Sequence, residues 1–352
     1  MVWTKTGTHA HAPRYSDLGT LREHSWSTRE RIALISTLAI VMGALFVTTY
    51  SLALGDPVPH RIDAAVVGDP AAHPQVVRSV QTVAGGALVF RHYASLPDAL
   101  HAVGLQHDYA VLDLASPRPT LYVASAAGAS VARVLERISA LDPHVRVVDA
   151  HPLDVHDPSG IDIFYLMLVA TIIGFITVFQ IGAQVSDMSL RHWTEFIIGL
   201  ALVASLVFVL VDGPLLHRLD LPVLEAWGIL ALQLVAVASF ARLMTILLGR
   251  WSILPTWLFF VVLGNSSSGG AVAPPLLPRP FAFVSQWLPS GATVTALRNA
   301  IYFHAYQHTQ PLAVLATWAV TLFAAMIVVS RHRATSSVLV ERSGRMHGEA
   351  TT

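Results

Sequence analysis

The sequence predicts a polytopic α-helical membrane protein with six transmembrane helices and an extracellular α/β domain inserted between the first and second helices. Two observations predict this class. One apolar span near the N-terminus is followed by a long mixed segment and then by five more apolar spans. The composition agrees, because 54% hydrophobic and 12% charged residues, with a mean hydropathy of +0.57, leave too little polar surface for a soluble chain.

The first predicted span is 31–54, which follows a polar N-terminal tail of residues 1–30. Its length matches a hydrocarbon core of about 30 Å at about 1.5 Å per helical residue. A cleaved signal peptide is the alternative. The apolar run is too long for one, starts too far along the chain, and is followed by no convincing small-residue cleavage site.

The segment 55–160 predicts a small α/β domain, because short β-rich runs alternate with amphipathic helical runs. The predicted strands are Ala64–Val67, Ala87–Phe90, Tyr109–Leu114, Thr120–Ala124 and Val145–Val148. The predicted helices between them are Pro74–Val83, Leu96–Val103 and Ala127–Leu141.

The region 161–330 predicts five further transmembrane helices, followed by a polar tail at 331–352. The spans are Ile161–Ala183, Thr194–Val211, Val223–Leu247, the short Ser252–Gly264, and Leu312–Ser330. Arginines flank one set of span ends, namely Arg22, Arg29, Arg31, Arg191, Arg242, Arg250, Arg331 and Arg333. By the positive-inside rule, both termini are cytoplasmic and 55–160 lies outside the plasma membrane.

A broken or re-entrant segment is predicted at 264–304, because the short fifth span runs into glycines, serines and prolines. The candidate gate residues are Gly264, Asn265, Ser268, Gly269 and Gly270. Non-helical backbone at membrane depth is tolerated only when it is buried in protein or lines a wet cavity. The alternative is an ordinary proline-rich outer loop.

After this break, Phe281–Leu288 and Val294–His304 are expected to form short helices near the outer surface. Trp287, Tyr302 and Phe303 would then act as aromatic anchors at the membrane interface.

Several short motifs occur in order around the break: Gly264-Asn265 through Gly269, Pro275-Leu276-Leu277-Pro278, Trp287-Leu288-Pro289 with Gly291, and Ala296-Leu297-Arg298. With the span layout, they resemble the ABC-2 type permease superfamily, especially its YhgE/Pip-like and actinobacterial permease-like members. The resemblance extends from Ile32 to Arg331. Ser266 stands where the family pattern Gly-Asn-Pro-x-Ser-Gly has proline.

The resemblance implies a permease subunit that pairs with a second copy or a homologue in the membrane and with a separate ATPase. The chain has no phosphate-binding loop motif, and Lys5 is its only lysine. In the family, the loop between the second and third spans contacts the ATPase. That loop includes Gln184, Asp187, Arg191 and Glu195, although a solvated loop that only sets topology is the alternative.

An ion-coupled transporter is disfavoured, because the middle of each span is almost free of ionisable residues. Asp162, Glu195, Asp212, Glu225 and Arg242 all fall near span ends. The polar residues within spans are Gln180 and Gln233, which are either interhelical hydrogen-bonding residues or substrate contacts.

The sequence predicts no catalytic residues, no cofactor and no metal site. Absent cysteine excludes thiol chemistry, and zero net charge gives no reason to expect nucleic acid. His304 and His308 share one helical face, but two ligands do not make a metal site.

Two functional hypotheses therefore lead. The first is the permease of an ATP-driven exporter for a lipid-like, peptide or other amphipathic compound, embedded among membrane lipids. The second is a non-transporting cell-envelope scaffold or receptor of the YhgE/Pip type.

Overall fold

The computed structural model describes residues 27–55, 57–185, 188–304 and 306–349, and it divides into two compact units, Met1–Leu45 and Phe46–Thr352. Most of the predicted N-terminal tail therefore lies outside the described residues. Helix α1 (Thr28–Leu54) starts at a capping box. The Ser27 backbone N–H donates to Glu30 Oε2 at 2.7 Å, and the Glu30 N–H donates to Ser27 Oγ at 3.3 Å.

Five described helices are long and apolar enough to cross a membrane, which supports the predicted membrane class. They span Thr28–Leu54, Asp162–Gln184, Leu190–Leu215, Val223–Trp251 and Thr309–Arg333. The remaining apolar helix, Ile253–Asn265, is shorter, in agreement with the short span expected there. Six crossings therefore stay a prediction.

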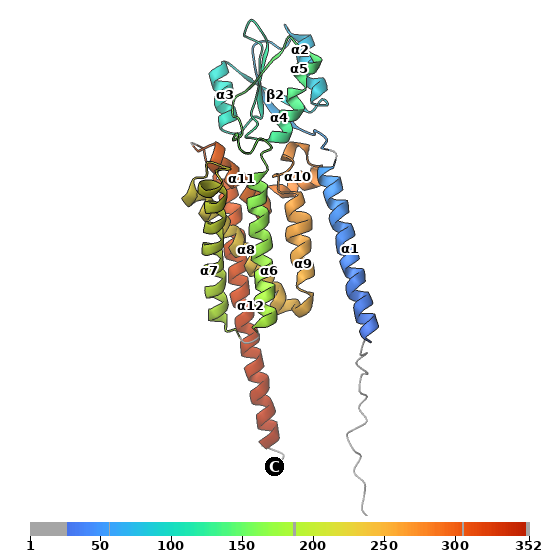
Figure 1. Cartoon of the computed structure of the whole chain (residues 1–352), viewed down its shortest axis with the longest axis vertical. Coiled ribbons are helices and arrows are strands. Elements are labelled where there is room, and N and C mark those ends of the chain that lie inside the picture. Colours follow the sequence, from blue (N-terminus) through green and yellow to red (C-terminus); the bar gives the residue numbers. More distant parts are fainter. Residues whose placement is uncertain (1–26, 56, 186–187, 305, 350–352) are drawn as a thin grey trace, which may run out of the picture. The chain divides into compact units, whose positions relative to one another are not determined.

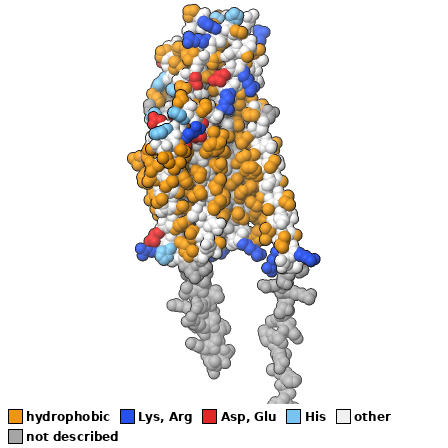
Figure 2. All heavy atoms as spheres, viewed as in Figure 1, with side chains coloured by type: hydrophobic (Ala, Val, Ile, Leu, Met, Phe, Trp, Pro, Cys, Tyr) orange, Lys and Arg blue, Asp and Glu red, His pale blue; other side chains and the backbone are white. Residues whose placement is uncertain are grey.

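Helix α8 (Val223–Leu248) is the central helix of a bundle in the second unit, packed against α6 (Asp162–Gln184), α7 (Leu190–Leu210) and α12 (Thr309–Glu349) (Figure 1). Close approach of α6 and α8 depends on Gly174, where a Cβ would lie 3.0 Å from Val237 Cγ1. A short π-helix, η1 (Val211–Leu215), contains Pro214 and ends the α7 span. Hydrophobic side chains cover the visible flank of the bundle (Figure 2).

Helix α12 continues to Glu349, through residues that the sequence analysis assigns to a polar tail. An existing helix adds residues at little cost, and the first glycine after Arg333 is Gly344.

Residues 57–160 form a five-stranded mixed sheet with helices, as predicted. The strand order is β2-β1-β3-β4-β5, and only β3 and β4 pair antiparallel. The strands are β1 (Ile62–Val67), β2 (Leu88–Tyr93), β3 (Ala110–Asp113), β4 (Thr120–Val123) and β5 (Arg146–Asp149). Strand β1 pairs on both sides in parallel and is buried along most of its length, as a central parallel strand should be. We call this region the sheet domain.

The helices of the sheet domain are α2 (Pro74–Val83), α3 (Leu96–Gly104), α4 (Ala129–Glu136) and α5 (Ile138–Leu141). Ser95 caps α3 by accepting from the Asp98 N–H at 3.3 Å. The prediction of a single helix over Ala127–Leu141 is wrong in one respect. The chain forms two helices there, α4 and α5, which are separated at Arg137.

The segment between α8 and α12 contains several short elements. They are η2 (Gly249–Trp251), α9 (Ile253–Trp257), the π-helix η3 (Leu258–Asn265), η4 (Pro274–Leu276), α10 (Arg279–Ser285) and α11 (Pro289–Tyr302). The two helices expected after the break are therefore present as α10 and α11.

The expectation that both helices lie exposed at the membrane interface is wrong for α11. This helix is buried along most of its length among α6, α8, α12 and η3. Phe303 is also buried, in an apolar cluster with sheet-domain residues such as Val67 and Val111, so it does not anchor a membrane interface. Small residues explain the difference, because alanine, serine, threonine and glycine let α11 pack closely between larger helices. Trp287 is exposed, as an interface anchor requires.

Candidate functional site

The predicted break is a sharp turn that two glycines make possible. The preceding helix ends in the π-helical form of η3, a widened geometry often found at functional positions. Gly269 has a φ of +75°, which glycine adopts without strain. A Cβ on Gly270 would lie 2.8 Å from Phe164 Cβ on α6. A side chain at Gly270 would therefore push the break away from α6, and one at Gly269 would strain the turn.

Polar side chains of the break are buried. The Ser268 hydroxyl donates to the Asn265 carbonyl at 2.9 Å and accepts from the Gly270 N–H at 3.3 Å. The Asn265 side chain lies next to Tyr50 but outside hydrogen-bond geometry, and Ser290 Oγ on α11 has no hydrogen-bond partner within the described residues. A Cβ on Gly264 would lie 2.8 Å from that hydroxyl. Buried polar atoms without a protein partner mark places where water or a ligand binds.

The chain just after the break completes the core of the sheet domain. Val272, Ala273, Leu276 and Leu277 are buried in the same apolar cluster as β1 and α4 residues. The Ala273 N–H donates to Ser130 Oγ at 2.9 Å, and the His60 N–H donates to the Pro275 carbonyl at 3.0 Å. The segment 272–277 therefore joins the break to the sheet domain through apolar packing and two hydrogen bonds.

Arg298, on α11, holds the other side of the break. Its Nη2 donates to the Gly269 carbonyl at 3.0 Å. The phenol rings of Tyr109 and Tyr302 lie near its guanidinium. Burial lowers the pKa of Arg298 and raises the pKa of Tyr109, and it raises the pKa of Tyr302 to about 12. Both phenols are therefore neutral at physiological pH and do not offset the charge of Arg298.

A cavity of about 290 Å³ lies beside this guanidinium, between the sheet domain and the adjacent ends of α11 and α12. We call it the arginine chamber. Its lining mixes polar and apolar surface and comes from Gln106, Asp108, Tyr109, Ala127, Pro274, Thr295, Arg298, His308, Gln310 and Pro311. The cavity is large enough for several water molecules or a small polar group.

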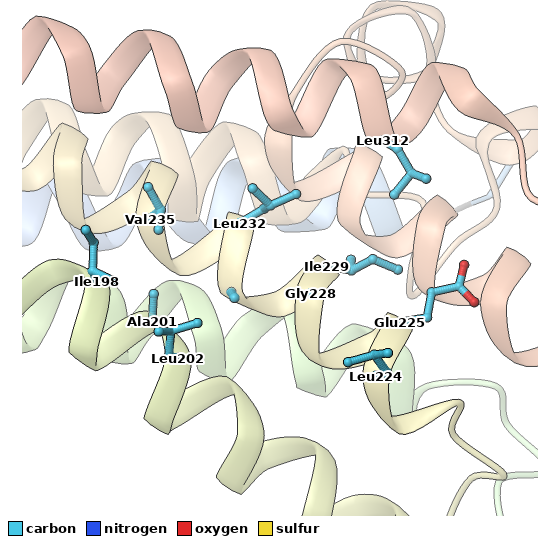
Figure 3. A pocket seen from close by; sticks show the side chains of 11 residues that line it. Ile198, Ala201, Leu202, Leu224, Glu225, Gly228, Ile229, Leu232, Val235 and Leu312 are labelled. Atoms are coloured by element: carbon cyan, nitrogen blue, oxygen red, sulfur yellow. The ribbon is translucent and has the colours of Figure 1, made fainter.

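A second hollow, the α7–α8 groove, is apolar and has a volume of about 490 Å³. Figure 3 shows hydrophobic side chains along it and Glu225 near one end. The Glu225 carboxylate accepts a hydrogen bond from Gln307 Nε2 at 2.7 Å. Gly228 lines the groove, and a Cβ there would meet nothing within 4 Å.

The predicted ATPase-contacting residues lie at the end of the bundle far from the sheet domain. Gln184 ends α6 and is exposed, whereas Asp187 lies outside the described residues. Arg191 and Glu195 form an exposed ion pair on α7, with Nε and Oε1 2.7 Å apart. Ser189 caps α7 by accepting from the His192 N–H at 3.3 Å.

A buried aromatic ring lies next to this pair. Trp193 is buried, and the Arg242 guanidinium of α8 lies 4.1 Å from the centre of its ring. The first turn of α7 is thus packed against α8. This packing holds in place the helix that carries the exposed Arg191 and Glu195.

The two predicted intramembrane glutamines differ in environment. Gln233 is buried and joins three helices, because its Nε2 donates to Thr171 Oγ1 and its Oε1 accepts from the Thr293 hydroxyl, both at 3.0 Å. Gln180 is exposed on α6 and has no hydrogen bond to any residue that the structure describes. Gln233 therefore acts between helices, and Gln180 does not.

His304 and His308 do not form a pair of ligands. His308 Nε2 donates to the Leu105 carbonyl at 3.0 Å, while His304 is exposed. Across residues 27–349 with their gaps, no three histidine, aspartate or glutamate side chains are placed to hold a metal ion.

The arginine chamber and its link to the sheet domain are not predicted from the sequence. In the sequence, Arg298 stands out only as part of the motif Ala296-Leu297-Arg298. One signal was available: it is a lone charge in the run Gly291–Ile301, whose other residues are uncharged. The partners Gly269 and Ser130 are far away in the sequence and gave no signal.

Comparison with protein-family models, curated proteins and solved structures gives no match.

Proposed function

We propose that the chain is the membrane-spanning permease subunit of an ATP-driven exporter of the ABC-2 type. The observation that carries the proposal is the break after η3, where buried polar residues inside an apolar bundle are tied directly to a separate sheet domain. Non-helical backbone among membrane helices is tolerated only where it is buried in protein or lines a water-filled cavity, and a path or gate provides such a place. The sheet domain would act as the outer gate or handoff surface.

The proposal includes six crossings, a plasma-membrane location, cytoplasmic termini and an outside sheet domain. Arginines at the sheet-distal end of the bundle support this orientation, since Arg191, Arg242, Arg250 and Arg331 lie at or near those helix ends. Ile253–Asn265 would be the sixth, incomplete crossing.

Labelling of introduced cysteines tests this topology, because the chain has none of its own. We expect Ala94→Cys, exposed in the sheet domain, to react with a membrane-impermeant maleimide in intact cells. Gln184→Cys, exposed at the far end of α6, should react only after the cells are opened. The reverse pattern would contradict the orientation, and equal labelling of both would contradict the membrane-spanning arrangement between them.

The energy source must be a partner, because the sequence lacks a phosphate-binding loop motif. The surface that we assign to this ATPase includes Gln184, Arg191 and Glu195. Exposed charges on a helix start that is held by a buried tryptophan are suited to docking a cytoplasmic partner.

A charge swap tests this surface without weakening the helix. We expect the double variant Arg191→Glu with Glu195→Arg to lose at least about tenfold of the ATPase recovered with the tagged chain after mild cross-linking, which corresponds to about 1.4 kcal/mol. The swap keeps an i,i+4 ion pair and places the acid nearer the helix N-terminus, so the stability of α7 should be unchanged or slightly higher. Mass spectrometry of the captured proteins measures the loss.

The controls separate the possible results. Recovery of an ATPase with both the native chain and the swapped variant would support the exporter but reject this docking surface. Recovery of envelope proteins without an ATPase, from native membranes, would contradict the exporter.

An amphipathic substrate fits the surfaces available. The α7–α8 groove offers apolar contact, with the single carboxylate of Glu225 near one end. The arginine chamber offers polar contact at the sheet-domain end of the helices. A lipid-like molecule or an apolar peptide carries both kinds of surface.

One observation favours the second candidate, a cell-envelope scaffold or receptor. The sheet domain and segment 272–277 share one continuous apolar core, which suits a rigidly mounted binding domain. The capture experiment distinguishes the two functions, because a scaffold should recover envelope proteins without an ATPase.

A further inference from the structure

The guanidinium of Arg298 is a half-buried charge without a counter-ion. It donates one hydrogen bond, from Nη2 to the Gly269 carbonyl, although an arginine has five N–H donors. In the part of the chain that the structure describes, no carboxylate lies within ion-pair distance of it. Its closest ionisable neighbours, Tyr109 and Tyr302, are neutral phenols.

Two carboxylates in this part of the protein are paired. Asp162 Oδ2 accepts from Arg218 Nε at 2.8 Å. Asp108 accepts from the Tyr93 hydroxyl at 2.9 Å and lies 3.6 Å from Arg91 Nη1. Removing a charge from water without a partner is unfavourable, so an unpaired, half-buried arginine beside a cavity is a place where an anion can bind.

The arginine chamber places hydrogen-bond donors around the same guanidinium. The Gln106 side-chain N–H₂ is buried and has no hydrogen-bond partner among the described residues. Thr295 and Gln310 also line it, but the Thr295 hydroxyl donates to the Gly291 carbonyl at 2.9 Å and Gln310 Nε2 donates to the Gln286 carbonyl at 3.0 Å, so Arg298 and Gln106 are the side chains with unused N–H donors. These unused donors favour an anionic group, and arginine binds phosphate and carboxylate with two parallel N–H bonds.

Asp108 also lines the chamber, and one of its carboxylate oxygens, Oδ1, accepts no hydrogen bond. Repulsion from it is reduced, because Arg91 lies beside it and because burial raises the pKa of Asp108. The same oxygen can accept from an amine or hydroxyl group. A ligand with an anionic group and a nearby donor fits better than a bare anion.

An exposed tryptophan of the kind that anchors proteins at a membrane interface lies near the chamber. Gln310 Nε2 donates to the Gln286 carbonyl at 3.0 Å, and the next residue is the exposed Trp287. The Trp287 carbonyl in turn accepts from Trp318 Nε1 at 2.8 Å. Tryptophans with apolar faces and satisfied N–H groups collect at the headgroup level of membranes.

We propose that the arginine chamber is a binding site for a phosphate or carboxylate group, which Arg298 holds. The group can belong to a lipid headgroup or to a soluble anion. The inference is independent of transport, because it applies equally to a permease and to a scaffold.

Thermal unfolding of the full-length protein in detergent tests the site. The probes are inorganic phosphate and acetate, each at constant ionic strength, phosphatidic acid, phosphatidylethanolamine, and diacylglycerol as the lipid without phosphate. We expect phosphate-bearing probes to raise the midpoint by about 5 °C at a hundredfold excess over the dissociation constant. A rise with inorganic phosphate identifies a soluble source, and a rise with the phospholipids alone identifies a headgroup.

Two variants decide whether Arg298 is responsible. Arg298→Met should abolish the probe-dependent rise and change the midpoint without probe only slightly, because the loss of the hydrogen bond to the Gly269 carbonyl is offset by the removal of an unpaired charge. Arg279→Met is the matched control, since Arg279 is exposed at the start of α10 and does not line the chamber; it should keep the full rise.

The proposal is overturned if no anionic probe stabilises the native chain, or if Arg298→Met keeps the rise. Should Arg298→Met fail to fold, native mass spectrometry of the wild-type chain replaces it. A phosphate- or carboxylate-bearing molecule that co-purifies and is displaced by excess phosphatidic acid supports the site, and a chain free of any such molecule overturns it.

Discussion

Replacing Gly291 by alanine should lower the thermal midpoint of the purified chain by more than about 6 °C, or at least about 3 kcal/mol of unfolding free energy. Gly291 lies in the first turn of α11, where the chain returns from α10. A Cβ there would lie 1.9 Å from the Ser285 carbonyl oxygen and 2.8 Å from its carbonyl carbon. Both are backbone atoms, so no side-chain rotation relieves the overlap, and α10 must separate from α11.

Matched controls come from glycines with free space. Gly199→Ala and Gly228→Ala add the same methyl group to membrane helices where a Cβ meets nothing within 4 Å. Alanine is the better helix former by about 1 kcal/mol, so these variants should be neutral or slightly stabilising. Tryptophan fluorescence during heating compares the three. An unchanged midpoint for Gly291→Ala would mean that the α10–α11 turn is looser than the structure shows.

Replacing Gln233 by leucine should destabilise the bundle by about 1–3 kcal/mol. Hydrogen bonds between membrane helices contribute about 0.6 kcal/mol on average and up to about 1.7 kcal/mol, and Gln233 makes two. Thr171 keeps a second bond, from its hydroxyl to the Met167 carbonyl at 2.9 Å, which limits the cost on α6. The contact with Thr293 is a hydrogen bond between α8 and α11, which also pack through apolar side chains.

A double-mutant cycle measures that contact. Gln233→Leu and Thr293→Val should each lower the unfolding free energy, and the combined loss should be smaller than their sum by about 0.6–1.7 kcal/mol. Gln180→Leu is the matched control, because it removes an exposed glutamine from α6 and should change stability by less than about 0.5 kcal/mol. Strict additivity between Gln233 and Thr293 would show that the hydrogen bond carries no net stability.

The helices and strands were largely predictable because their signals are local. Apolar runs of membrane length gave the long spans, and β-rich runs between helical runs gave the sheet domain. Helix α2 matches its predicted bounds, Pro74–Val83, because proline suits a helix start and Gly85 and Gly86 adopt positive φ just after its end. The shortness of Ile253–Asn265 was likewise visible in the number of apolar residues before the glycines.

The burial of α11 and Phe303 was not predictable, because it depends on neighbours far away in the sequence. The composition of α11 has small residues and several hydroxyls, which is equally compatible with a surface helix and with a tightly packed one. Only contact with α6, α8 and α12 decides between them.

By itself, the sequence determined that the protein has long apolar helices, a separate mixed α/β segment and a break near Gly264, since chain length, hydropathy and glycine content fix these locally. Tertiary structure alone decided which residues of the break and of the helix bundle meet. Gly269 meets Arg298, Ala273 meets Ser130, and Gln233 meets Thr171 and Thr293. Each contact joins residues that only the packing of helices and sheet brings together, because the energy of a buried hydrogen bond or an unpaired charge depends on the surroundings that packing creates.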